Sequence, residues 1–199
     1  MKHTLPAVAL VAAASAQTAP ASGLNYDLLT ISRHQRQNAV AVQATLKDTD
    51  FLVGAATSNN NWNSGPNNWG YGDATRGQIS LGYVFKNVTN GIDATVGVIQ
   101  TNGDSSIYSV VLRRQLNEVY QGLEISVGYA GALSSANRFN GSFVFGGTSA
   151  EGAQSISYVE LAYNINKTFA LAVGLVNPGR TAGYFSSDRA TVFSVRAGF

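Results

Sequence analysis

The chain has 199 residues, no cysteine and a formal net charge of +2 at pH 7. These values exclude a disulfide framework and thiolate metal sites, and they give no electrostatic case for nucleic-acid binding. Only 12% of the residues are charged, whereas glycine is abundant at 21 residues and Tyr and Phe number 9 each. Such a composition is typical of strands separated by turns rather than of helices or disordered chains.

The first 16 residues have the pattern of a secretory signal peptide. A short positive start containing Lys2 precedes an apolar run at 5–14, and Ala14-Ser15-Ala16 forms a small-x-small cleavage site. We therefore expect a signal peptide at 1–16 and one mature domain at 17–199. A buried N-terminal strand or helix is the alternative. The apolar run is too short to span a bilayer as a helix, which takes about 20 residues.

Ten segments with period-2 alternation of apolar and polar residues follow one another along the mature chain. Most are about 9–11 residues long, the length that a tilted strand needs to cross a hydrocarbon layer. The predicted strands are 24–33, 38–46, 51–58, 77–85, 92–101, 106–115, 122–132, 155–165, 168–176 and 190–199.

Three of the connections between these strands are long, and the others are short, including 34–37 and 102–104 at the same end as the long ones. Short turns are predicted at 47–50, 87–91, 116–121 and 164–167, and long polar stretches at 59–76, 133–154 and 177–189. In an up-and-down meander all three long stretches emerge at the same end. Tight turns at one end and longer loops at the other are typical of barrels that span membranes.

The two faces of the strands differ in character. In 168–176, for example, Leu171 and Val173 alternate with Ala170 and Ala172, and most other segments repeat this contrast of large apolar with small or polar residues. A small or polar face suits a wet or hydrogen-bonded lumen, so the apolar face should point to lipid. In lipid only closure removes the unpaired sheet edges, which predicts a closed barrel. A soluble barrel that binds a small apolar ligand is the alternative.

The mature chain from 24 to 199 resembles the small outer-membrane β-barrels of Gram-negative bacteria, the OmpA-like and porin-like group. The resemblance rests on the signal peptide, the opening strand LNYDLLTISR, hairpins such as QISLGYVFKNVTNGIDATVGVIQT and the terminal TVFSVRAGF. It implies an all-β, closed up-and-down antiparallel transmembrane barrel in the cell outer membrane. The alternation predicts ten strands, and many relatives in the group have eight.

The resemblance also implies partners. The alternating strand that ends in an aromatic resembles the C-terminal signal read by the barrel assembly machinery, here Phe193, Val195, Ala197 and Phe199. Periplasmic chaperones would deliver the chain, and outer-membrane lipid and lipopolysaccharide would surround it.

Charged residues are few on the strand faces assigned to the lumen: Asp27, Asp93, Arg113, Glu124, Glu160 and Arg196. We expect Arg113 to pair with Glu124, and Arg196 to pair with Asp27 across the closing seam. Because buried charge is costly unless paired, we predict an ion-pair layer that blocks or narrows the inner mouth. Independent solvated charges in a water-filled lumen are the alternative.

No catalytic, metal or cofactor site is predicted. His34, the one histidine of the mature chain, lies in a short connection and is interpreted as an exposed rim residue beside Arg33 and Arg36, which could contact lipopolysaccharide phosphates. Trp62 and Trp69 in the long stretch 59–76 could stack on a sugar, although a turn-rich outer loop whose aromatics contact the rim is favoured.

The function predicted is therefore that of an integral outer-membrane barrel with a structural or narrow-pore, porin-like role. The alternative is a surface binding or adhesion protein that acts through the loops 59–76, 133–154 and 177–189. The possible partners are a surface glycan or a small solute. A barrel enzyme is the remote alternative.

Overall fold

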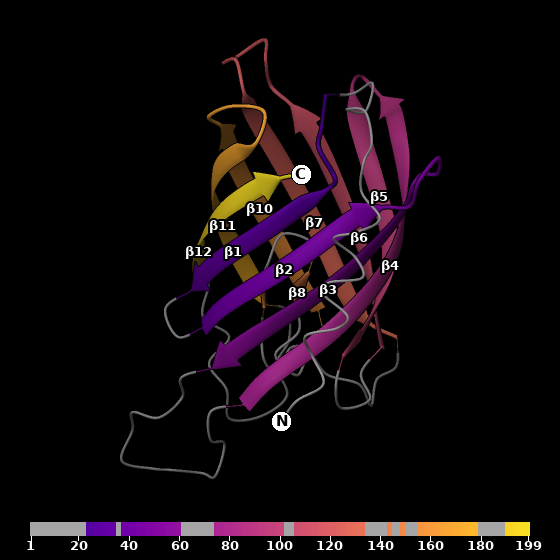
Figure 1. Cartoon of the computed structure of the whole chain (residues 1–199), viewed down its shortest axis with the longest axis vertical. Coiled ribbons are helices and arrows are strands. Elements are labelled where there is room, and N and C mark those ends of the chain that lie inside the picture. The colour runs from indigo at the N-terminus through magenta and orange to yellow at the C-terminus, as the bar shows by residue number, and fades with distance from the viewer. Residues whose placement is uncertain are drawn as a thin grey trace.

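The protein is a closed antiparallel β-barrel of ten strands (Figure 1). The structure, a computed structural model, describes residues 23–34, 37–60, 74–101, 106–133, 143–144, 148–149, 155–178 and 190–199. The strands are β1 (Leu28–His34), β2 (Gln37–Thr45), β3 (Phe51–Asn60), β4 (Ala74–Thr89), β5 (Ile92–Thr101), β6 (Ser106–Gln115), β7 (Leu123–Ala132), β8 (Phe143–Val144), β9 (Thr148–Ser149), β10 (Ser155–Asn164), β11 (Phe169–Pro178) and β12 (Ala190–Gly198).

The barrel closes where the last strand pairs with the first. Around the wall the order is β1-β12-β11-β10-β7-β6-β5-β4-β3-β2, and β8 and β9 form a separate two-stranded hairpin. The prediction of ten barrel strands in up-and-down order is confirmed, and the alternative of eight is wrong. The β8–β9 hairpin lies within the stretch 133–154, which was predicted only as a long connection.

Two strands differ from the predicted bounds by three residues or more, and the others differ by at most two residues at either end. The strand expected at 24–33 begins only at Leu28, because the residues before it leave the wall and enter the lumen. The strand expected at 77–85 runs from Ala74 to Thr89 and turns tightly at Asn90 and Gly91, whose φ angles are 45° and 74°. Two consecutive left-handed residues form the hairpin turn that suits the twist of the strands, and Asn-Gly is a preferred sequence for it.

Large apolar side chains cover the outside of the wall, as the alternation predicts. Along β11 the exposed Leu171, Val173 and Leu175 alternate with the buried Ala170 and Ala172. The same outward exposure is found for Ile79, Leu81, Val96, Val98, Val110, Leu112, Val127, Val159, Leu161, Phe193 and Val195. Val42 and Ala44, also assigned to the outer face by the alternation, are buried.

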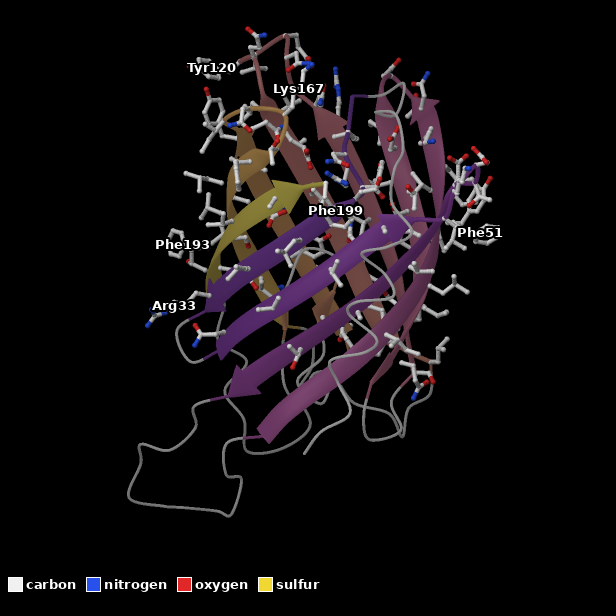
Figure 2. The ribbon with its side chains drawn as sticks, in the orientation of Figure 1. Arg33, Phe51, Tyr120, Lys167, Phe193 and Phe199 are labelled. Atoms are coloured by element: carbon white, nitrogen blue, oxygen red, sulfur yellow. The ribbon has the colours of Figure 1, made fainter. Side chains whose placement is uncertain are left out.

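Aromatic side chains gather towards the two ends of the wall. At the short-turn end the rings of Phe51 and Tyr83 are 5.1 Å apart between centroids, and those of Tyr120 and Tyr163 are 5.7 Å apart. Figure 2 shows Tyr120 and Lys167 at this end and Arg33 far from them towards the other. Girdles of aromatic residues at two depths are the pattern of barrels that sit in a bilayer. Within the described residues no helix is long and apolar enough to cross a membrane.

Candidate functional site: the barrel lumen

The lumen holds every charged side chain that is buried among the described residues. These are the six residues that the strand pattern assigns to it: Asp27, Asp93, Arg113, Glu124, Glu160 and Arg196. The side chains come from β5, β6, β7, β10 and β12, of which β7 and β10 are neighbours in the wall, and from Asp27 just before β1.

Four of these residues form one ion-pair network. Arg113 donates to Glu124 Oε1 from Nε at 2.9 Å and from a terminal nitrogen at 2.7 Å. Arg196 donates to the same oxygen at 3.2 Å and, through its other terminal nitrogen, to Glu160. Two guanidinium groups and two carboxylates thus alternate across the lumen. The charges balance within the network, which is what a buried set of ions requires.

The predicted pair between Arg196 and Asp27 is wrong. In the closing seam Thr30 lies opposite Arg196, and Leu28 lies opposite Gly198. Asp27 instead accepts hydrogen bonds on Oδ1 from the backbone N–H of Thr45, at 2.6 Å, and from its hydroxyl, at 2.9 Å. Arg196 of β12 reaches away from the seam, past β11 to Glu160 on β10 and to Glu124 on the next strand, β7.

Asp93 is joined to the network through a residue that the sequence analysis did not single out. Tyr26 donates its hydroxyl hydrogen to Asp93 Oδ2 at 2.8 Å, and the guanidinium carbon of Arg113 lies 4.7 Å from the centre of the Tyr26 ring. The backbone N–H of Asn87 donates to the other Asp93 oxygen at 2.8 Å. Tyr26 precedes β1, and burial raises the pKa of its phenol well above the ordinary range. The sequence offered one signal, a tyrosine in the alternating run before Leu28.

Residues 23–27 lie inside the mouth of the barrel at the short-turn end. Three side chains of the wall donate to carbonyl oxygens of this segment: Gln115 to Gly23 at 2.6 Å, Arg113 to Asn25 at 3.0 Å, and Gln43 to Tyr26 at 3.0 Å. Leu24 and Tyr26 are almost fully buried and cluster with Leu52 and Val84, which are residues of β3 and β4.

The lumen is nearly filled at the level of the ion pairs. A cavity of about 20 Å³ there, between Tyr26, Arg113 and Arg196, has room for little more than one water molecule. Beyond residues 23–27 a vestibule of about 660 Å³ opens at the short-turn end and is lined by Gln115, Lys167 and other turn residues. The ion pairs and residues 23–27 therefore both lie towards the short-turn mouth.

Towards the long-loop end the lumen is more apolar than the sequence analysis expects. The inner faces of the strands were interpreted as small or polar, yet they also bring branched aliphatic side chains together with Tyr158. This cluster consists of Ile99, Ile107, Val111, Ala130, Tyr158, Val176 and Val192. A ten-stranded barrel is close to the size that side chains can fill, so the interior is occupied by its own residues.

Glycine makes room for the largest inner side chain. Gly128 lies opposite Tyr158 in the β7–β10 pairing, and a Cβ atom added at Gly128 would fall within the Tyr158 ring. At Gly174, also on an inner face, an added Cβ would meet its neighbours at 3.5 Å, an ordinary contact distance.

The remaining predicted sites lie at the ends of the barrel. Phe193, Val195 and Phe199 are exposed on the outer face of the closing strand, with Ala197 half-buried beside them. Arg33 is exposed at the long-loop end. The signal peptide at 1–16, Trp62, Trp69, Arg36, the side chain of His34 and most of the three long loops lie outside the described residues. Within the described part of the chain, no group of three His, Asp or Glu side chains could hold a metal ion.

No family model and no curated protein matches the chain. Among solved structures, the porin NanC matches with 8% identity and a TM-score of 0.47 over 86% of this chain and 98% of NanC. OccAB3 of Acinetobacter baumannii matches with 15% identity and a TM-score of 0.34, over 81% of this chain and 48% of its own. OmpF of Salmonella typhi, in complex with daunomycin, matches with 17% identity and a TM-score of 0.35, over 86% of this chain and 56% of its own. The identities and TM-scores are too low to assign the chain to a family.

Proposed function

We propose that the protein is an integral outer-membrane β-barrel with a porin-like role and a narrow lumen. One observation carries the proposal: a closed ten-stranded wall exposes its large apolar side chains outward and encloses the charged ones. A soluble barrel would hide the apolar set. In a bilayer the same arrangement is favourable, because closure leaves no unpaired backbone edge and lipid covers the apolar wall.

The ion-pair layer and Tyr26 together set the size of what could pass. With about 20 Å³ of space beside Arg113 and Arg196, the resting lumen has room for water and not for a sugar or a peptide. The layer supports a narrow path or a structural barrel, and it argues against a general porin with a wide aqueous channel.

Export and assembly complete the proposal. Cleavage after residue 16 would release the mature chain to periplasmic chaperones, and the assembly machinery would recognise the outward residues of β12 that end in Phe199. The short turns would then face the periplasm and the long loops the outside, where Arg33 would lie near lipopolysaccharide phosphates. Membership of the OmpA-like group is part of the same proposal and rests on the sequence features alone.

Planar-bilayer recording of the refolded, detergent-purified protein tests this function. We expect stable insertion and small, infrequent conductance steps, because the lumen is constricted. A wide channel that admits sugars in a liposome-swelling assay would contradict the constriction. A mature chain that remains a soluble monomer without detergent would contradict the whole proposal.

A further inference from the structure

Residues 23–27 behave differently from the strands that surround them. Their alternation continues that of β1, yet they leave the wall at Leu28 and fill the short-turn mouth. Gly23 begins the segment with a φ of 73°, and the Asn25 side chain accepts a hydrogen bond from the backbone N–H of Asp27 at 2.9 Å. These local features bend the chain inward instead of extending the first strand.

This segment borders two spaces. Tyr26 lines the small cavity beside the ion pairs, whereas Gly23 and Asn25 line the vestibule. Leu28, Arg113 and Arg196 border both spaces, and Glu124 lines the vestibule as well. The segment therefore lies beside the charged layer, and the two together stand at the boundary between the vestibule and the small cavity.

The contacts that hold the segment differ from those that hold the wall. Most polar contacts run from wall side chains, Gln43, Arg113 and Gln115, to its carbonyl oxygens, and from the Tyr26 hydroxyl to Asp93. At its C-terminal end Asp27 also accepts hydrogen bonds from Thr45 on its carboxylate and from the backbone N–H of Phe199 on its carbonyl oxygen. The ladder between β1 and its two neighbours begins at Leu28. Withdrawal of the segment would thus break these contacts and expose two apolar residues, while the strand pairing from Leu28 onward stayed in place.

The hydrogen bonds of the ion pairs are not made to the segment. Arg113 binds Glu124 through Nε and a terminal nitrogen, and we expect both hydrogen bonds to persist when Tyr26 is removed. The nitrogen that Arg113 points at the segment is the remaining one, which donates to the Asn25 carbonyl.

We propose that residues 23–27 are an autoinhibitory plug that closes the lumen at the short-turn mouth and opens it by withdrawing into the vestibule. The proposal rests on the porin-like function proposed above. Tyr26 is the main anchor, because its ring is buried under the Arg113 guanidinium and its hydroxyl binds Asp93. The vestibule, at about 660 Å³, is large enough to receive a displaced segment of five residues in part.

Single-channel recording of Tyr26→Ala tests the plug. Loss of a buried aromatic anchor should raise the open-to-closed ratio about a hundredfold over the wild type. Tyr26→Phe keeps the ring and loses only the hydroxyl, so its open-to-closed ratio should lie between those of the wild type and Tyr26→Ala. Phe51→Ala is the matched control, because this aromatic residue is exposed on the outer wall at the same end and is not among the vestibule-lining residues, and it should conduct like the wild type.

A disulfide lock provides a second, independent variant. An ideal Cβ at Gly198 lies 3.6 Å from Asn25 Cγ, the position that a cysteine sulfur would take at residue 25, so we expect Asn25→Cys with Gly198→Cys to join the plug to β12 on oxidation. Oxidation should abolish the openings and reduction should restore them.

The outcomes separate the two proposals. If Tyr26→Ala inserts and conducts like the wild type, the plug proposal is wrong. It is also wrong if the cysteine pair shows the same conductance in its oxidised and reduced forms. The porin-like function would survive either result if the wild type inserts. Failure of the wild type to insert into a bilayer overturns the function itself.

Discussion

Glu124→Gln removes the charge at the centre of the lumen network and is the most informative single change. Glu124 is 3% exposed, and one of its oxygens accepts three hydrogen bonds from two guanidinium groups. The substitution leaves Arg113 and Arg196 with only Glu160 between them, so a balanced set of two positive and two negative charges acquires a net charge of one. Removal of one partner from a buried ion pair costs about 3–5 kcal/mol. That loss corresponds to about two to four powers of ten in the folding equilibrium.

Urea unfolding of the barrel in lipid vesicles, followed by heat-modifiable migration on gels, measures this loss. Glu118→Gln is the matched control. Glu118 also pairs with an arginine, Arg114, at 2.6 Å, but their side chains are 53% and 39% exposed. An exposed pair of this kind contributes about 0–1 kcal/mol, so the control should leave the unfolding midpoint nearly unchanged.

A double-mutant cycle then isolates the pair itself. Arg113→Gln combined with Glu124→Gln should be less destabilised than the sum of the two single variants, because each single change leaves its partner buried without compensation. If Glu124→Gln costs no more than Glu118→Gln, the lumen charges are independently solvated, and the ion-pair interpretation of the constriction is wrong.

Three further predictions concern packing, assembly and pH. Gly128→Ala should destabilise the barrel by about 1–3 kcal/mol, because the new methyl group overlaps the Tyr158 ring, whereas Gly174→Ala at an open inner position should be nearly neutral in the same urea assay. Deletion of Phe199 should lower the amount of folded barrel recovered from outer membranes, measured as the heat-modifiable band, and an unchanged yield would remove it from the assembly signal. Burial raises the pKa of Tyr26, so its neutral phenol should contribute fully to stability below pH 10 and less as the pH rises above that value. In Tyr26→Phe, the free energy of unfolding should lose the part of its decrease above pH 10 that comes from this phenol, as measured by urea unfolding at a series of pH values.

The wall of the barrel could be predicted from the sequence because period-2 alternation is a local property. Along Ala170, Leu171, Ala172 and Val173, each side chain alone indicates its face, and nine more segments repeat the pattern. Connection lengths then fix which ends meet. The same locality identified the six buried charges, since a charged residue on a small-residue face can only point into the lumen.

The partners of those charges could not be predicted in the same way. Whether Arg196 meets Asp27 or Glu160 depends on the register of the closing seam and on the distance across the lumen, and neither is encoded in local alternation. The pair of Arg113 and Glu124 could be predicted, because a single short turn joins their two adjacent strands.

The inward course of residues 23–27 is the clearest departure. Leu24 and Tyr26 continue the alternation of β1, so the pattern predicts strand there. The contacts that decide otherwise come from Asp93 and Arg113, which are 67 and 88 positions away from the residues they bind. Long-range side-chain contacts override local propensity at this point.

Fluorescence quenching by lipids with brominated acyl chains tests the central claim, the outward orientation of the apolar wall. Single tryptophans at Leu171 and Ala170 are compared, with Trp62 and Trp69 replaced by Phe. These neighbours on β11 lie on opposite faces, Leu171 exposed and Ala170 buried. The account predicts strong quenching at position 171 and little at position 170. Equal quenching at both, or quenching at position 170 alone, would contradict it.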